Sequence, residues 1–222
     1  MTVPERLSAL RQEMRAQDLS LYLIPTSDFH GSEYVGDYFK CRSYISGFTG
    51  SAGTLLVGLD SAGLWTDGRY FLQAGQQLSG SGITLFKMGE PGVPELMDYI
   101  VQQLPQGGRL GFDGRTLDTG FVRKLEQRLA EKGGVLCPEL DLAGAVWPDR
   151  PSLSCRPAWE LDLTYAGESR QDKLTRVRSA MEQAGAQQLL VTALDEIAWL
   201  LNIRGDDVEC NPVVLSYALV TS

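Results

Sequence analysis

One short loop of the sequence gathers the residue types that metal or acid–base chemistry needs. Asp28, His30 and Glu33 lie in the stretch Ser27-Asp-Phe-His-Gly-Ser-Glu-Tyr34, directly after an apolar run. Two carboxylates and an imidazole could bind a metal ion or a cationic group, and α/β proteins usually bind ligands beyond a strand end. The structural alternative is that Asp28 and Ser32 cap a turn while His30 hydrogen-bonds to backbone. His30 is the only histidine, which excludes a site built from several histidines.

Arg69 is a second candidate because its charge does not suit its position. It follows an Asp-Gly pair in the stretch Trp65–Ala74, which couples an expected strand to an expected helix. The start of a helix favours anions, so a cation placed there gains nothing from the helix dipole. We therefore expect Arg69 to pair with an acidic side chain, with Glu33 or Asp28 as the candidates. A buried structural ion pair and a ligand-facing role are both open.

Two other stretches suggest ligand sites but carry weaker patterns. Gly47, Gly50 and Gly53 resemble a phosphate-binding loop, but a strand follows them and no lysine accompanies them. A tight connection in which backbone approaches backbone is the better interpretation. The acidic loop Arg204–Glu209 could bind a cation, but its spacing is not that of an EF-hand, which favours a solvated turn.

The composition narrows the classes of function. The chain has 222 residues, with 20 Lys and Arg against 28 Asp and Glu, and a net charge of −8. This acidic balance argues against nucleic acid as a partner, because phosphate binding needs a basic face. We expect no membrane association, since no stretch has the ~18 apolar residues of a membrane span and the N-terminus has no secretory signal. The four cysteines form no C-x-x-C pair, which predicts free thiols in a reducing cytoplasm.

Alternating helix and strand patterns must position these residues. Thr2-x-x-Glu5 is a capping box, and an apolar stripe at helical spacing follows it. The expected strands are Leu19–Ile24, Thr54–Leu59, Gly63–Thr66, Ile83–Met88 and Arg109–Phe112. The expected later helices are Arg69–Leu78, Pro94–Leu104 and Leu117–Lys132, the last ended by a glycine pair. Residues 137–167 have no period, so we expect a linker that packs on a neighbour through Trp147 and Trp159.

The opening pattern of the chain returns near its end. At an offset of 167 residues, without a gap, the matched pairs are Thr2 with Ser169, Glu5 with Asp172, Leu7 with Leu174, Arg11 with Arg178, Met14 with Met181 and Asp28 with Asp195. The same cap, amphipathic helix, strand and acidic residue thus occur twice, which indicates duplication. The second copy has few residues in which to bury a core. We therefore expect a first domain over residues 1–157, and over 158–222 a linker with the truncated start of a related domain that has an exposed sheet edge.

Taken together, the motifs resemble one enzyme family. SDxHxSEY, R-x-Y-x-SGFTGSAGT, LWTDGRYFLQA and TALDEIAWLLNIRGxDVxxNPV are similar to segments of cytosolic Xaa-Pro aminopeptidases, which are creatinase/prolidase-like (pita-bread) metallopeptidases. The resemblance covers essentially the whole chain. It implies an α/β fold: a creatinase N-terminal-like domain with a mixed sheet flanked by helices, followed by the start of a second, related domain.

The resemblance also implies that catalysis belongs to a different domain from the one described by this sequence. In the family a separate C-terminal catalytic domain binds two divalent metals, commonly manganese, through Asp, His and Glu, and releases the N-terminal residue that precedes proline. We expect the catalytic domain and its metal ligands to be missing from this chain. We therefore predict that the chain is inactive alone and holds no cofactor. The N-terminal region is expected to support a homodimer and to help form the substrate entrance for proline-containing peptides.

The resemblance also bears on individual positions. Glu33 and Arg69 match family positions implicated in substrate handling or site integrity. Asp28, His30 and Arg42 also match motif positions, without a firm role for any of them. Two other functions are open: a stand-alone peptide-binding or regulatory module of the same fold, and an unrelated enzyme that uses Asp28, His30 and Glu33.

Overall fold

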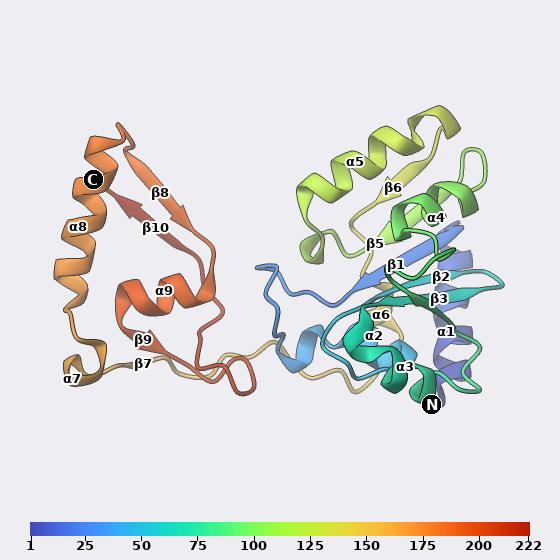
Figure 1. Ribbon diagram of the computed structural model, residues 1–222, viewed down its shortest axis with the longest axis horizontal. Helices are drawn as coiled ribbons and strands as arrows, with labels where there is room; N and C mark the ends of the chain where they lie inside the picture. Colours follow the sequence, from blue (N-terminus) through green and yellow to red (C-terminus); the bar gives the residue numbers. More distant parts are fainter. The chain divides into compact units, whose positions relative to one another are not determined.

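The computed structural model describes residues 1–222, which form two compact units. The first unit comprises residues 1–33 and 39–151, and the second comprises residues 34–38 and 152–222. Figure 1 shows the elements of both units. The domain boundary expected after residue 157 stays a prediction.

A six-stranded mixed sheet forms the centre of the first unit. Its strand order is β4-β3-β2-β1-β5-β6, and β2 alone runs opposite to the other five strands. The strands are β1 (Leu21–Pro25), β2 (Thr54–Gly58), β3 (Ala62–Thr66), β4 (Thr84–Lys87), β5 (Arg109–Phe112) and β6 (Val135–Cys137). This arrangement confirms the expected α/β class, although the short strand β6 was not predicted.

Helices cover both faces of this sheet and make three layers (Figure 1). One face carries α1 (Val3–Ala16), α2 (Cys41–Ser46), α3 (Phe71–Gln77) and α6 (Leu142–Ala145). The other face carries α4 (Leu96–Gln103) and α5 (Thr119–Leu129). Short 3-10 turns lie at η1 (Asp37–Phe39), η2 (Gly68–Tyr70), η3 (Gly114–Thr116) and η4 (Ala130–Lys132).

The central strand β1 is buried on both faces, as expected of a strand in a three-layer α/β protein. Tyr22 and Ile24 point into the core under α1 and α2, whereas Leu21 and Leu23 point into the core under α4 and α5. The apolar stripe of α1 faces the first of these cores. The capping box at Thr2 forms as predicted, with the Glu5 amide donating to Thr2 Oγ1 and the Thr2 amide donating to Glu5 Oε2.

The second unit is smaller and has helices on one face of a two-stranded sheet. Its elements are β7 (Trp159–Glu160), α7 (Leu163–Ala166), α8 (Arg170–Gln183), β8 (Gln188–Val191), α9 (Leu194–Leu201), β9 (Ile203–Arg204) and β10 (Ala218–Thr221). Strand β8 pairs with β10, and β7 pairs with β9. The core lies between α8, α9 and the inner face of β8 and β10.

The predicted repeat is present in the structure down to its caps. Helices α1 and α8 both have 14 residues and begin and end at positions 167 apart. Ser169 caps α8 through the Asp172 amide, as Thr2 caps α1. The match does not extend to the acids, because Asp28 lies in a loop whereas Asp195 lies in the first turn of α9.

The expected linker contains more regular structure than its sequence suggested. Residues 137–167 include α6, β7 and α7, each of only two to four residues, which is too short to show a period. Trp147 packs as expected, stacked on Tyr44 with ring centroids 4.4 Å apart. Trp159 instead is exposed on β7.

Candidate functional site

The parallel strands of the first unit bring several loops to one edge of the sheet. Strands β1, β3, β5 and β6 all run in the same direction, so the residues that follow them share this edge. The chain continues from β1 to β2 on one side, while β5 is added later on the other side. Open α/β sheets usually bind ligands outside such a point of divergence, beyond the carboxyl ends of the strands.

The loop after β1 is held by Asp28. Its Oδ1 atom accepts hydrogen bonds from the amides of His30 at 2.8 Å and Ser32 at 2.9 Å. Its carboxylate is fully buried, and its Oδ2 atom lies 4.0 Å from Nδ1 of His30, whose side chain is 4% exposed. Asp28 therefore caps a turn, which was the alternative to a role in binding a metal ion or a cationic group. Glu33, in contrast, is exposed at the end of the loop.

Arg42 is buried, and it fastens two loops together. From α2 it donates to Thr26 Oγ1 at 2.8 Å, to the Phe48 carbonyl at 2.6 Å and to the Gly50 carbonyl. Burial lowers the pKa of its guanidinium to about 10. The glycine-rich loop is thus a tight connection, as predicted, and its shape is fixed by Arg42.

Arg69 is exposed, and its partner is neither Glu33 nor Asp28. It pairs with Asp67, two residues earlier, through Nε to Oδ1 at 3.0 Å and Nη2 to Oδ2 at 2.9 Å. The hydrogen bond and charge of Asp67 raise the pKa of Arg69, with a smaller contribution from Glu33. The expectation of a distant acidic partner was therefore wrong, because the Asp-Gly turn lets the guanidinium fold back on the preceding acid.

A second Asp-Gly-Arg turn, which the sequence analysis missed, has the same geometry. Asp113 follows β5 and accepts from the Arg115 amide at 3.1 Å, from its Nε at 2.9 Å and from its Nη2 at 2.9 Å. In both turns the aspartate caps a 3-10 turn directly after a strand. The repetition of the tripeptide after two expected strands was the signal that could have revealed it.

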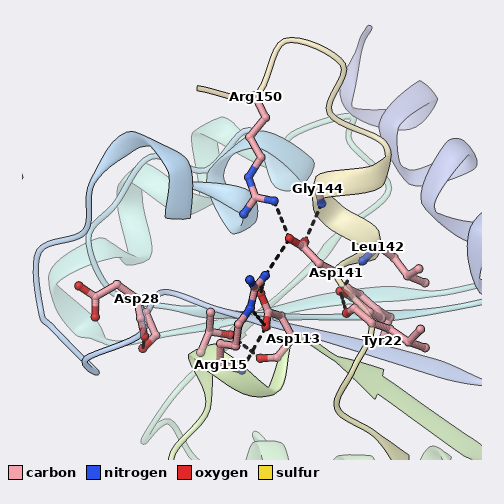
Figure 2. A network of polar contacts seen from close by, with 11 residues as sticks. Tyr22, Asp28, Asp113, Arg115, Asp141, Leu142, Gly144 and Arg150 are labelled. Atoms are coloured by element: carbon pink, nitrogen blue, oxygen red, sulfur yellow. Dashed lines mark hydrogen bonds and ion pairs between the residues drawn. The ribbon is translucent and has the colours of Figure 1, made fainter. Parts of the chain in front are cut away.

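The second turn belongs to a larger ionic network. Asp141 accepts from Arg115 at 3.3 Å and from Arg150 at 2.6 Å, and it also caps α6 through the Gly144 amide at 2.9 Å. Figure 2 shows Asp141 between the two guanidinium groups, while the Asp28 carboxylate lies apart from them. The network borders a small recess, whose lining includes Pro25, Ser27, Phe39, Cys41 and Thr116.

Tyr22 connects the central strand to the same segment. Its hydroxyl donates to the Leu140 carbonyl at 2.7 Å and accepts from the Leu142 amide at 2.9 Å. Burial raises the pKa of this phenol. The segment that ends the first unit is therefore attached to the sheet by a neutral hydroxyl as well as by charges.

The donor groups in the chain do not suit a metal centre. No three side chains among His, Cys, Asp and Glu lie close enough together to hold a metal ion. Asp113 and Asp141 are paired with arginines, and Asp28 holds backbone amides. In the acidic loop of the second unit, Asp207 is buried and accepts from Ser154 Oγ and the Leu215 amide, so the expected solvated turn is instead an internally bonded one.

None of the helices has the length and apolar character needed to cross a membrane.

Comparison with known proteins identifies two matching family models. A model described as the creatinase/prolidase N-terminal domain matches residues 6–139. A second model with the same description matches residues 149–222. These ranges follow the two compact units and the duplicated helix–strand pattern.

Curated relatives match the chain almost from end to end. A probable Xaa-Pro aminopeptidase P of Laccaria bicolor is 41% identical over 98% of this chain and 34% of its own length. Aminopeptidase P2 of Arabidopsis thaliana is 40% identical over 99% of this chain and 32% of its own length. The chain therefore spans about a third of the curated relatives that it matches.

A solved structure shares the fold of the whole chain. The X-prolyl aminopeptidase of Caenorhabditis elegans, described as a cytosolic enzyme with a di-nuclear active site, is 35% identical with a TM-score of 0.91. The match covers 100% of this chain and 38% of that protein.

Proposed function

The chain belongs to the creatinase/prolidase N-terminal domain family, and from that premise we propose that it is the non-catalytic N-terminal region of a metal-dependent Xaa-Pro aminopeptidase. The parent enzyme releases the N-terminal residue that precedes proline from a peptide. The main support for this proposal is the structural match to an aminopeptidase described as di-nuclear. The match covers the whole of this chain but only 38% of that enzyme.

The metal chemistry in this proposal lies outside the 222 residues. Two divalent metals, manganese in our proposal, need a set of carboxylate and imidazole ligands. The acidic side chains nearest the strand ends are paired with arginines or accept hydrogen bonds from backbone amides. No three side chains of His, Cys, Asp or Glu form a group that could hold a metal ion. We therefore derive no catalytic step from this chain. We propose that the chain comprises a first domain, residues 1–157, followed by a linker and the start of a related domain, residues 158–222.

The proposed role of the region is to support a homodimer and to form part of the substrate entrance. Arg69 suits an entrance because it is exposed and Asp67 holds its guanidinium in one orientation. Glu33 is exposed and lies near enough to affect Arg69 electrostatically. An acidic group at an entrance attracts the free amine of a peptide. Asp28, His30 and Arg42 support the loops behind these two residues. By analogy with the cytosolic relative, we place the enzyme in the cytoplasm.

The direct test is an aminopeptidase assay of this chain with Xaa-Pro dipeptides and tripeptides in the presence of manganese. We expect no release of the N-terminal residue, while a full-length relative assayed in parallel is active. Turnover by the chain alone would contradict the proposal. Binding of the peptides without turnover would favour the alternative of a stand-alone peptide-binding or regulatory module.

The entrance role is tested in a full-length enzyme that contains these motifs. Glu33→Ala and Arg69→Ala should lower kcat/KM without changing the melting temperature, because both side chains are exposed. Unchanged kinetics with a lowered melting temperature would show that the two residues are structural. Arg128→Ala, which breaks an exposed ion pair with Asp98, is the matched control.

A further inference from the structure

At the place where an open α/β sheet usually binds its ligand, an arginine of the chain itself forms part of the wall. The recess at the carboxyl ends of β1, β5 and β6 is lined by Ile24 and Pro25 of β1, by Asp113 after β5 and by Asp141 after β6. Arg150 also lines it, with a side chain 13% exposed. It is the last charged residue of the first unit, which ends at Pro151.

The charges around Arg150 are matched within the network. Asp113 and Asp141 provide two carboxylates, and Arg115 and Arg150 provide two guanidiniums. Asp141 joins them, because one of its oxygens accepts from both arginines. Its other oxygen caps α6 through the Gly144 amide. Both carboxylates of the network are thus paired with guanidinium groups of the chain itself.

The local sequence makes room for this guanidinium. A Cβ atom on Gly144 would overlap Nη1 of Arg150 and lie 2.8 Å from both carboxylate oxygens of Asp141. Any larger residue at this position must push the two side chains aside. Gly144 lies in α6 without a positive φ, so its backbone conformation itself does not require glycine. A methyl group at position 144 would therefore displace the ends of the Arg150 and Asp141 side chains from their present contact.

We infer that the crevice at the strand ends serves as an internal guanidinium site, whose occupant is Arg150. The site anchors residues 141–150 to the sheet at the point where the chain leaves the first unit. The anchor adds to the Tyr22 hydroxyl bonds to Leu140 and Leu142. A place that other α/β proteins use for a diffusible ligand is, in this chain, used to fix the segment that ends the first unit.

Hydrogen exchange of the whole chain tests the anchor. Four amides in this segment donate to carbonyls within it, namely those of Ala145, Val146, Trp147 and Arg150. We expect Gly144→Ala to raise exchange of peptides from residues 142–150 by about tenfold, equivalent to about 1.4 kcal/mol in the opening equilibrium. Exchange of β1 and β5 should stay at the level of the parent chain. Arg128→Ala, which breaks an exposed pair between α4 and α5, should leave the segment unchanged.

Chemical rescue separates a guanidinium site from a general packing defect. Arg150→Ala should show the same rise in exchange, and millimolar methylguanidinium should reverse it by filling the site. The double variant Arg150→Ala with Asp141→Asn should not be rescued, because the accepting carboxylate is gone. Normal exchange in Gly144→Ala, or failure of methylguanidinium to protect folded Arg150→Ala, would overturn the inference. If Arg150→Ala does not fold, the Gly144→Ala result decides alone.

Discussion

Buried cations in this chain are held mainly by neutral oxygens. Arg42 donates to a threonine hydroxyl and two carbonyls, and Lys173 donates to the Trp199 carbonyl at 2.9 Å and Asn202 Oδ1 at 2.6 Å. Neither is paired with a carboxylate at these contacts. Burying a charge is costly unless hydrogen bonds satisfy it, so each cation makes its surrounding loop depend on it.

Arg42→Ala is expected to destabilise the first unit. The substitution removes three hydrogen bonds to a charged donor and leaves the Phe48 and Gly50 carbonyls without that donor, for an expected loss of at least about 2 kcal/mol. Chemical denaturation measures the change. Arg69→Ala is the control, since its side chain is exposed and should leave the denaturation midpoint unchanged. Equal effects of the two substitutions would contradict the role assigned to Arg42.

Cys41 predicts a loss of stability at high pH. Burial raises the pKa of its thiol to about 12, well above the ordinary value of a cysteine. The folded state then binds more protons than the unfolded state above pH 9, so its stabilisation is complete below that pH and falls by up to about 1.4 kcal/mol per pH unit up to pH 12.

Thermal unfolding from pH 8 to pH 11 measures this dependence. The melting temperature of Cys41→Ala should fall less steeply with pH than that of the parent. Cys155→Ala, at an exposed thiol, should follow the parent curve. Parallel curves for all three proteins would show that the Cys41 thiol does not contribute.

Contacts between individual residues were predictable from the sequence where the two residues lie close along the chain. The turn capped by Asp28 and the box at Thr2 depend on residues two to four positions apart, and both are visible in the pattern. The loops that Arg42 joins and the contact of Asp141 with Arg115 depend on how separate strands end at one edge. That information lies in the sheet order, which periodicity alone does not give.

At the scale of elements, the duplicated helix pair reuses one interaction with different residues. Arg6 of α1 donates to the Tyr44 carbonyl and lies 4.3 Å from the Tyr44 ring centroid. Lys173, 167 positions later, donates to the Trp199 carbonyl and lies 4.7 Å from the Trp199 ring centroid. In each unit a cation in the first turn of one helix thus holds an aromatic residue of the next helix.

This equivalence predicts that each cation stabilises only its own unit. Lys173→Met should raise hydrogen exchange in α8 and α9, with a loss of about 2 kcal/mol from the buried acceptors left behind. Arg6→Met should raise exchange in α1 and α2 instead. Exchange that rises equally in both units for either substitution would contradict the assignment.

Element boundaries were predictable where a motif marks them, and short elements were not. The end of α5 and η4 at Gly133, which has a φ of 60°, follows the expected glycine pair. Strand β6 and helix α6 have three and four residues, and their apolar positions are indistinguishable from a loop. Tertiary pairing with β5, not local preference, makes β6 a strand.

At the scale of the whole molecule, apolar exposure is unevenly distributed. Of fourteen exposed large apolar residues, ten belong to residues 34–38 and 152–222. On the outer face of β8 and β10, Leu190 and Leu219 are opposite each other and 63% and 60% exposed. The equivalent pair in the first unit, Leu23 and Leu56, is buried under α4 and α5.

We expect this outer face to cause self-association of the isolated chain. Residues 186–194 contain no charge, proline or glycine, so the edge of β8 lacks the usual protection against pairing. Light scattering should show a mass that rises with concentration, and the double substitution Leu190→Lys, Leu219→Lys should reduce the rise. Leu72→Lys, on an exposed residue of α3, should not. A monomer at all concentrations would contradict this expectation.

The strand order of the first unit has a consequence for how the chain acquires its structure. Strands β1, β2 and β3 are neighbours both in the sheet and along the chain, whereas β5, which pairs with the other edge of β1, begins some forty residues after the end of β3. Local contacts form sooner than distant ones, because less chain entropy is lost. During synthesis the antiparallel half can therefore assemble on the ribosome first, with one side of β1 open until the later strands emerge.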